Sequence, residues 1–242
     1  MNTARSAISS ITSVNSVNTI GDHPLVKRYM RGVFTKRPSL PKYSASWDVG
    51  VVLRFLKTLM PVNKLSLKQL TWKLVMLLAL LTGQRGQTLH LMDLRYIDIQ
   101  ENTVHIQLLD LLKTSKPGKH LKPITLERYY SDSSLCVVDT FKTYIDQTKV
   151  IRGKETKLFN PTVRPFKAIS RQTLSTWVQK ILCISGIDIK KFAPHSTRSA
   201  SVTTATKCGI PFDVFLKMAN WSSESTFYKF YFKPDNSQRN FN

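Results

Sequence analysis

The chain has 242 residues, which is enough for one sizeable domain or for a small domain beside a larger one. Hydrophobic residues make up 42% of the sequence, so a packed core is expected and disorder throughout the chain is excluded. Lysine and arginine number 36 against 15 acidic residues, which leaves a formal charge of +21. This excess favours nucleic acid as the partner over an RNA-associated structural role or a membrane surface.

The cysteines and the apolar runs narrow the class of protein further. Cys136, Cys183 and Cys208 are widely spaced and form no C-x-x-C pair, which argues against a disulfide framework or a zinc site. No apolar run approaches the roughly 18 residues of a membrane span, and residues 74–81 form only a short buried stretch. The first residues lack the pattern of a secretory signal. We therefore expect a soluble intracellular protein without a metal, cofactor or membrane partner.

The N-terminal part differs in composition from the rest of the chain. Residues 1–20 are rich in serine, threonine and asparagine, which suits a flexible tail, yet isoleucine and valine recur there at every third position. A short amphipathic helix ending near Gly21 fits this segment as well as disorder does. Three prolines and a basic run over residues 27–37 then predict an extended, positively charged connector that can lie along a DNA backbone.

From residue 46 the hydrophobic pattern is mainly helical. Apolar spacing, serine caps and closing prolines predict helices over residues 46–60, 66–81, 135–150, 170–185, 194–208, 211–219 and 223–231. Short strands are predicted over residues 96–99 and 103–112, with a return strand over residues 119–124 after a turn at Pro117-Gly118. The sequence therefore predicts a mainly α fold with a small antiparallel β-sheet, an α+β arrangement.

Two groups of polar residues suit an attack on a DNA phosphodiester without a metal. Such a reaction needs a nucleophile, an acid for the leaving 5′ oxygen, and cations such as arginine on the non-bridging oxygens. Arg85 lies between Gly83 and Gly86, where the backbone can turn sharply and approach a ligand. His195 and Arg198 are three residues apart at a predicted helix start, so they share one face near the positive end of the helix dipole. Taken singly, each pattern also fits an ordinary loop or helix start.

Longer strings around these residues resemble the motifs of tyrosine recombinases. LTGQRGQTL resembles the first-arginine box, and HSTRSASVTTA resembles the His-x-x-Arg box. NWSSESTFYKFYFKP is similar to the tryptophan-to-tyrosine end in recombinases of DIRS-type and Ngaro-type retrotransposons and of Crypton elements, and HPLVKRYMRGVFTKRP resembles their linker. The three boxes occur in the family's order, and the similarity extends from His23 to Pro234. The resemblance implies the fold of a tyrosine recombinase catalytic domain.

The resemblance also implies a role for each matching residue. Arg85 and Arg198 would clamp the scissile phosphate, and His195 would be a general acid or base that also contacts it. Trp221 stands where many relatives have a second histidine, and its indole N–H can donate to a phosphate oxygen. Tyr231 would be the nucleophile, forming a 3′-phosphotyrosyl bond and freeing a 5′-hydroxyl.

For the nucleophile and for the catalytic lysine, the sequence leaves two candidate residues each. Tyr228 lies on the same predicted helix as Tyr231, and the FYF context favours Tyr231 as the nucleophile. The catalytic lysine of the family lies on the β-hairpin, where Lys113 is favoured over Lys116. Lys116 and Lys119 are then expected to bind the DNA backbone.

By resemblance, residues 1–22 would be the last helix of a core-binding domain, residues 23–45 a basic linker and residues 46–242 the catalytic domain. The chain is then expected to be a fragment, a truncated element product or a catalytic domain alone. The linker residues expected to bind DNA are Arg28, Arg31, Lys36 and Arg37. Two positions depart from the pattern: Thr88 replaces a common glutamate, and Asn220 replaces a common glycine.

The resemblance finally implies the activity, the partners and the location. The expected activity is site-specific cleavage and rejoining of double-stranded DNA for integration or recombination of a mobile element. The chain would be a monomer without DNA and a homotetramer on it, in the nucleus if the element is eukaryotic. The alternatives are a weak or inactive DNA-binding remnant of a transposable element, and a type IB topoisomerase-like activity.

Overall fold

The structure, a computed structural model, describes residues 2–15, 18–38, 43, 45–110, 122–164, 166–211 and 214. The chain divides into two compact units, Met1–Lys42 and Tyr43–Asn242. The predicted fold class is confirmed, since the described residues are mostly helical and include a small three-stranded antiparallel sheet.

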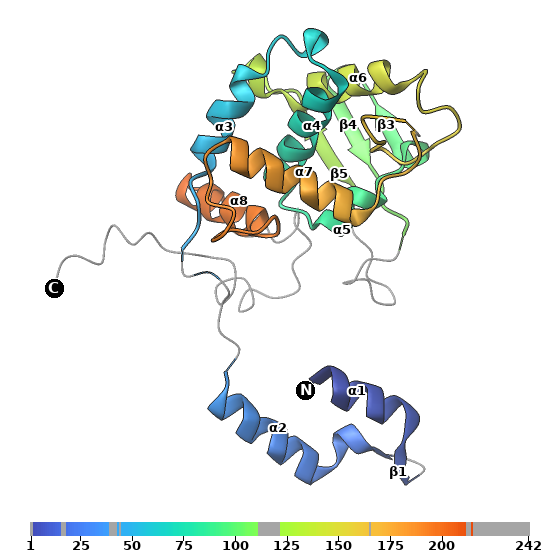
Figure 1. Cartoon of the computed structure of the whole chain (residues 1–242), viewed down its shortest axis with the longest axis vertical. Coiled ribbons are helices and arrows are strands. Elements are labelled where there is room, and N and C mark those ends of the chain that lie inside the picture. Colours follow the sequence, from blue (N-terminus) through green and yellow to red (C-terminus); the bar gives the residue numbers. More distant parts are fainter. Residues whose placement is uncertain are drawn as a thin grey trace, which may run out of the picture. The chain divides into compact units, whose positions relative to one another are not determined.

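The first unit contains two helices and a short hairpin, drawn in blue in Figure 1. Its elements are α1 (Asn2–Ile11), β1 (Ser13–Asn15), the antiparallel β2 (Asn18–Thr19), a 3-10 turn (Ile20–Asp22) and α2 (Pro24–Lys36). The expected first helix is present, but it ends before the hairpin and not near Gly21. The prediction of an extended connector is wrong for residues 24–36, which are helical. Pro24 occupies the first helical turn, where proline is tolerated, and the His23 ring accepts the Leu25 amide, so the segment starts a helix.

The second unit contains the other helices in the described part of the chain (Figure 1). Their bounds are α3 Val49–Thr58, α4 Leu67–Thr82, α5 Gly86–Leu91, α6 Val137–Thr148, α7 Arg171–Ile184 and α8 Ser196–Lys207, with 3-10 turns over Val62–Lys64, Leu94–Tyr96 and Ser133–Leu135. Helix α5 is missing from the sequence-based prediction, because six residues are too few to show an amphipathic period. The helices predicted over residues 211–219 and 223–231 lie outside the described residues, except for residues 211 and 214. No helix in the described part of the chain is both long and apolar enough to cross a membrane.

Helix α4 is the centre of the core. Ser66 and Gln69 form a reciprocal capping box at its start, which satisfies amide groups that the first helical turn leaves without partners. From Leu70 onward nearly every residue is buried, so the helix lacks a polar face and must be enclosed by other elements. Helices α5, α6, α7 and α8 all pack against it. The position of its C-terminal end is therefore set by the whole core.

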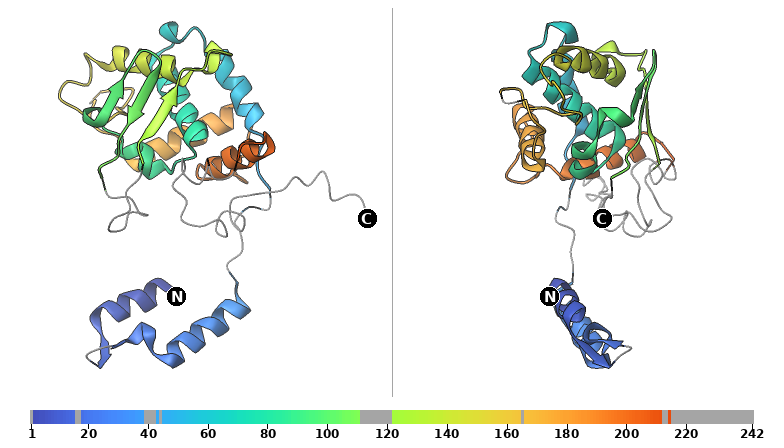
Figure 2. Two further views of the ribbon diagram at one scale, coloured as in Figure 1. Left: turned by 180° about the vertical axis from the view of Figure 1, so that it is seen from behind. Right: turned by 90° about the vertical axis from the view of Figure 1, so that its right-hand side faces the viewer.

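The sheet forms a layer on one side of the helices, as the two views in Figure 2 show. Its strands are β3 (Ile97–Ile99), β4 (Thr103–Ile106) and β5 (Ile124–Glu127), in the antiparallel order β3-β4-β5. Val104, Ile106, Ile124 and Leu126 are buried, and their neighbours along each strand are more exposed. The strand predicted over residues 103–112 is shorter than expected, since β4 ends at Ile106. The return strand was expected over residues 119–124, but β5 begins only at Ile124. The predicted turn at Pro117-Gly118 lies outside the described residues.

Lys73 makes stability depend on pH, because this lysine is completely buried in α4. Its Nζ donates a hydrogen bond of 2.6 Å to the Leu59 carbonyl, and desolvation lowers its pKa from 10.5 to about 8. Between these two values the unfolded chain keeps a proton that the folded chain has lost, so the free energy of unfolding rises with pH. In Lys73→Met we expect this rise, roughly 1–3 kcal/mol in total, to be absent.

Urea unfolding at several pH values from 7 to 10.5 measures this difference. Lys68→Met, at an exposed position on the same helix, is the control and should follow the unmodified chain. Parallel profiles for Lys73→Met and the unmodified chain would contradict the prediction.

Candidate active site

Arg85 follows directly from the way α4 ends. Gly83 closes the helix in the left-handed conformation (φ 56°), which a residue with a Cβ rarely adopts. The chain is extended again at Arg85 (φ −75°, ψ 151°), which is the N-cap residue of α5, and its carbonyl accepts the Leu89 amide at 3.2 Å. The side chain of Arg85 is half-buried. A rigid core helix and a tight turn therefore place this arginine.

The start of α8 provides the second part of the site. His195 is exposed and stands at the N-cap position, and Arg198 lies three residues later with 5% of its surface exposed. Helix α8 begins at Ser196, two residues after the predicted start at Pro194. The Ser201 hydroxyl donates to the Leu80 carbonyl, which links α8 to the last turn of α4. The two basic segments are thus connected through the core.

One pocket brings these residues together. Arg85, His195 and Arg198 line a cavity of about 340 Å³, to which α7 contributes Arg171. The other residues that line it are Ala79, Gln84, Gly86, Gln87, Leu89, Leu174, Ser175, Val178, Pro194 and Thr197. In the described part of the chain, no acidic residue lines the cavity. An anion bound there would contact neutral or cationic groups of these lining residues. Arginine donors suit a phosphate, because the guanidinium fork can donate two parallel hydrogen bonds to its oxygens.

The comparison with protein families agrees with this geometry. Residues 52–238 match the model of the phage integrase family, which is most of the chain. The chain belongs to the phage integrase family. Its members are the tyrosine recombinases, so the predicted catalytic-domain fold is confirmed. A comparison with curated protein sequences gave no match.

Solved structures of recombinases resemble this phage integrase family member in fold. XerA recombinase matches with a TM-score of 0.60 and 16% identity over 84% of this chain and 65% of its own. XerH recombinase bound to a palindromic difH substrate matches with a TM-score of 0.60 and 14% identity, over 83% of this chain and 51% of its own. A lambda integrase (75–356) dimer bound to a COC′ core site matches with a TM-score of 0.52 and 16% identity, over 90% of this chain and 72% of its own. The chain thus spans about half to two thirds of the two Xer recombinases.

Several predicted site residues lie outside the described residues. They are Lys113, Lys116, Lys119, Asn220, Trp221, Tyr228 and Tyr231. The roles of these residues, and the catalytic roles of Arg85, His195 and Arg198, stay predictions. Thr88, which stands where many relatives have glutamate, is buried on α5.

The first unit contains the basic residues that the sequence assigns to DNA binding. Arg28, Arg31 and Lys36 are exposed on α2, and Arg37 is exposed at its C-cap. Arg28 and Arg31 are three residues apart and therefore neighbours on one helix face. Their contact with DNA stays a prediction.

Arg171 lines the pocket but is not among the residues predicted from the sequence. It is the first residue of α7, directly after the cap residue Ser170, whose hydroxyl accepts the Thr173 amide at 3.1 Å. The sequence did predict the helix and its cap. The signal available in the sequence was a basic side chain in the first turn of a capped helix. The amide groups of that turn also favour an anion, so the two together indicate an anion-binding position. Its proximity to Arg85 depends on the packing of α5 against α7, which no local pattern reveals.

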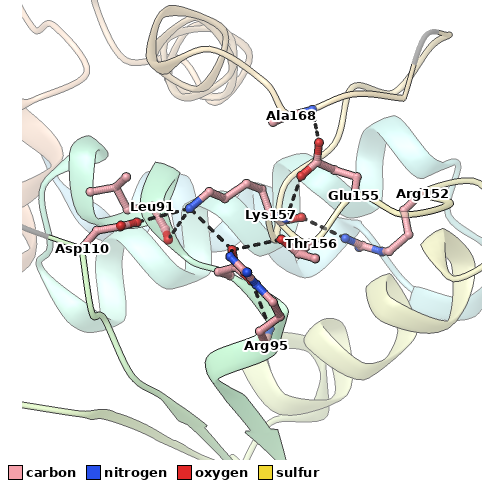
Figure 3. A network of polar contacts seen from close by, with 9 residues as sticks. Leu91, Arg95, Asp110, Arg152, Glu155, Thr156, Lys157 and Ala168 are labelled. Atoms are coloured by element: carbon pink, nitrogen blue, oxygen red, sulfur yellow. Dashed lines mark hydrogen bonds and ion pairs between the residues drawn. The ribbon is translucent and has the colours of Figure 1, made fainter.

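A polar network holds the segment between α5 and the sheet, and Figure 3 labels Arg95, Thr156 and Lys157 among its members. These three residues all contact Asp93. Asp93 is 2% exposed and accepts hydrogen bonds from the Arg95 backbone and guanidinium and from the Thr156 hydroxyl. Lys157 Nζ lies 3.6 Å from Asp93 Oδ2 and 3.2 Å from Asp110 Oδ2. The hydrogen bonds from Arg95 hold the pKa of the Asp93 carboxyl well below its ordinary value of 3.8. This carboxylate joins the segment between α5 and β3 to the loop after α6.

Replacing this carboxylate should reduce stability. Asp93→Asn keeps the size of the side chain but removes the charge that Arg95 and Lys157 contact, so we expect a loss of about 2 kcal/mol in the free energy of unfolding at pH 7. The contribution of Asp93 is complete above pH 3.8 and disappears as the pH falls toward the lowered pKa of the folded state.

Urea unfolding at pH 7 and at lower pH tests this prediction. Asp98→Asn, at an exposed position on β3, is the control and should change stability little. An equal effect of the two substitutions would contradict the role of the network.

Proposed function

We propose that this protein cleaves and rejoins double-stranded DNA at specific sites through a 3′-phosphotyrosyl intermediate. The observation that carries the proposal is the pocket in which Arg85, His195 and Arg198 converge. Membership of the phage integrase family supports it. The XerH and lambda integrase structures support it as well, since those proteins are described as bound to their DNA sites.

In the proposed reaction the pocket binds the scissile phosphate. Arg85 and Arg198 neutralise its non-bridging oxygens, which is where charge grows in the transition state. The Tyr231 hydroxyl oxygen attacks phosphorus while the bond to the 5′ oxygen breaks, and Lys113 supplies the proton that the leaving 5′ oxygen takes up. His195 contacts the phosphate and accepts the proton that the Tyr231 hydroxyl loses as it attacks. Attack by the freed 5′-hydroxyl on the phosphotyrosine reverses these steps and rejoins a strand.

We also propose roles for the residues around the reacting groups, and a type of mobile element, an assembly and a location for the protein. Trp221 donates its indole N–H to the phosphate, Lys116 and Lys119 bind the flanking backbone, and the basic residues of α2 lie along the DNA. We place the protein among recombinases of DIRS-type, Ngaro-type and Crypton elements, with residues 1–22 as the end of a core-binding domain and residues 23–45 as the linker. It would assemble as a tetramer on two duplexes, in the nucleus of a eukaryotic host.

The pocket arginines should be essential for cleavage. Arg85→Ala and Arg198→Ala each remove an oriented phosphate donor, so we expect the rate of covalent adduct formation on a nicked suicide duplex to fall by about 10²–10³-fold. Arg54→Ala is the charge-matched control, because Arg54 is exposed on α3 and does not line the pocket. It should retain most of the activity. A comparable loss in all three variants would show that general charge, and not the pocket, accounts for the effect.

The nucleophile can be identified on the same substrate. Tyr231→Phe should abolish the adduct, while Tyr228→Phe should retain it, because one hydroxyl alone can attack in line. Binding to intact duplex should persist in both variants and weaken steeply as salt is raised. The reverse result would assign the nucleophile to Tyr228.

Two outcomes would favour the other candidate functions. An unmodified chain that binds DNA but never forms an adduct would be an inactive remnant of a transposable element. Relaxation of supercoiled plasmid by monomer, without preference for a sequence, would indicate a type IB topoisomerase-like activity.

A further inference from the structure

Arg171 lies on the face of α7 that lines the pocket. This face also includes Leu174, Ser175 and Val178, which follow Arg171 at spacings of three, four and seven residues and line the same pocket. Residues at these spacings share one side of an α-helix, so α7 forms a wall of the pocket along two turns. Leu174 is 2% exposed and Val178 is 4% exposed, whereas Arg171 is exposed. The wall therefore runs from the interior at Val178 to the opening of the pocket at Arg171.

Two contacts from α5 fix the start of α7. A Cβ atom at Gly86, the first residue of α5, would lie 3.6 Å from Leu174 Cδ2, so α7 packs directly against the backbone there. The Nε2 atom of His90 lies 2.8 Å from the carbonyl oxygen of Ile169, two residues before Arg171. Because a carbonyl oxygen can only accept, the histidine ring donates this hydrogen bond. Both contacts hold the segment that carries Arg171 against α5.

The three arginines of the pocket differ in depth. Arg198 is 5% exposed, Arg85 is half-buried and Arg171 is exposed. A DNA duplex is too large to enter a cavity of about 340 Å³, so one phosphate can enter while its neighbours stay at the opening. Successive phosphates of one strand are about 3.4 Å apart along the helix axis, so a neighbouring phosphate lies close to the opening. The amide groups in the first turn of α7 also favour an anion at this place.

We propose that Arg171 binds the phosphate next to the scissile one on the cleaved strand. Arg85 and Arg198 then contact the phosphate inside the pocket, and Arg171 holds the strand at the opening, which keeps the inner phosphate aligned. The inference rests on the proposed function for the identity of the phosphate inside the pocket. The contact of Arg171 with DNA can be measured without cleavage.

The first experiment measures binding of the full chain to a DNA duplex of mixed sequence at several salt concentrations. Phosphate contacts do not depend on sequence, so this probe does not require the target site. Arg171→Ala should weaken binding about 10-fold, as the loss of a hydrogen bond to a charged group does. It should also reduce the slope of log affinity against log salt by about 1. Lys180→Ala, at an exposed position on the same helix that does not line the pocket, is the matched control and should change both quantities far less.

Equal effects of these two substitutions, or unchanged binding in Arg171→Ala, would overturn the proposal. Arg171→Lys keeps the positive charge and should retain most of the salt slope. The midpoint of thermal unfolding of Arg171→Ala should match that of Lys180→Ala, because both side chains are exposed. This match excludes a folding defect as the cause of weaker binding.

The second experiment locates the phosphate on the suicide duplex that the unmodified chain cleaves. An uncharged methylphosphonate replaces one linkage at a time, and binding of Arg171→Ala is compared with that of the unmodified chain. With the replacement next to the scissile phosphate, Arg171→Ala should cause no further loss of affinity, because the two changes remove the same contact. With the replacement at the scissile linkage, the loss should remain about 10-fold. The reverse pattern, or equal losses at every linkage, would overturn the proposal.

The two experiments separate this inference from the proposed function. If Arg171→Ala binds the mixed-sequence duplex less tightly but the unmodified chain forms no covalent adduct, strand cleavage fails and the contact of Arg171 with DNA stands. If the adduct forms but binding does not respond to Arg171→Ala, cleavage stands and the contact at the opening fails.

Discussion

The junction between α4 and α8 determines where the pocket can form. Helix α4 is enclosed by the core almost along its whole length, and its left-handed end at Gly83 directs the chain into Arg85. The hydrogen bond from Ser201 to the Leu80 carbonyl links this end to the helix that carries Arg198. Because interiors are closely packed, neither helix can shift relative to the other without opening a void. Two arginines far apart in the sequence are therefore held at fixed positions around one cavity.

The sequence predicted the features that arise from local chemistry. The Ser66 and Ser170 caps mark helix starts, and the unbroken apolar run in α4 predicts a buried helix, because such patterns reflect burial and capping directly. The prediction failed where one residue type permits two structures. Pro24 suits an extended connector, yet proline also fits the first turn of a helix, and α2 begins there. The sequence predicts the sheet but not the ends of its strands, since these depend on the pairing partners.

The residues of the candidate site also fall into two groups, those that the local sequence predicts and those that only the folded structure reveals. Arg85, His195 and Arg198 could be proposed from residue type and spacing, because phosphate chemistry requires those groups and the boxes resemble known motifs. Arg171 could not be proposed, since its place in the pocket comes only from contacts across the fold. The Asp93 network was equally hidden, because its partners lie on separate loops. Local patterns predict elements, and tertiary packing decides which side chains meet.

The arrangement around a bound phosphate can be observed directly in a crystal structure of the chain on an intact duplex, with Tyr231→Phe to prevent cleavage. We predict that the guanidinium groups of Arg85 and Arg198 both lie within hydrogen-bond distance of one phosphate, with the His195 ring beside it. A duplex that is bound elsewhere with the pocket facing away, or arginines that contact separate phosphates, would contradict the proposed active site.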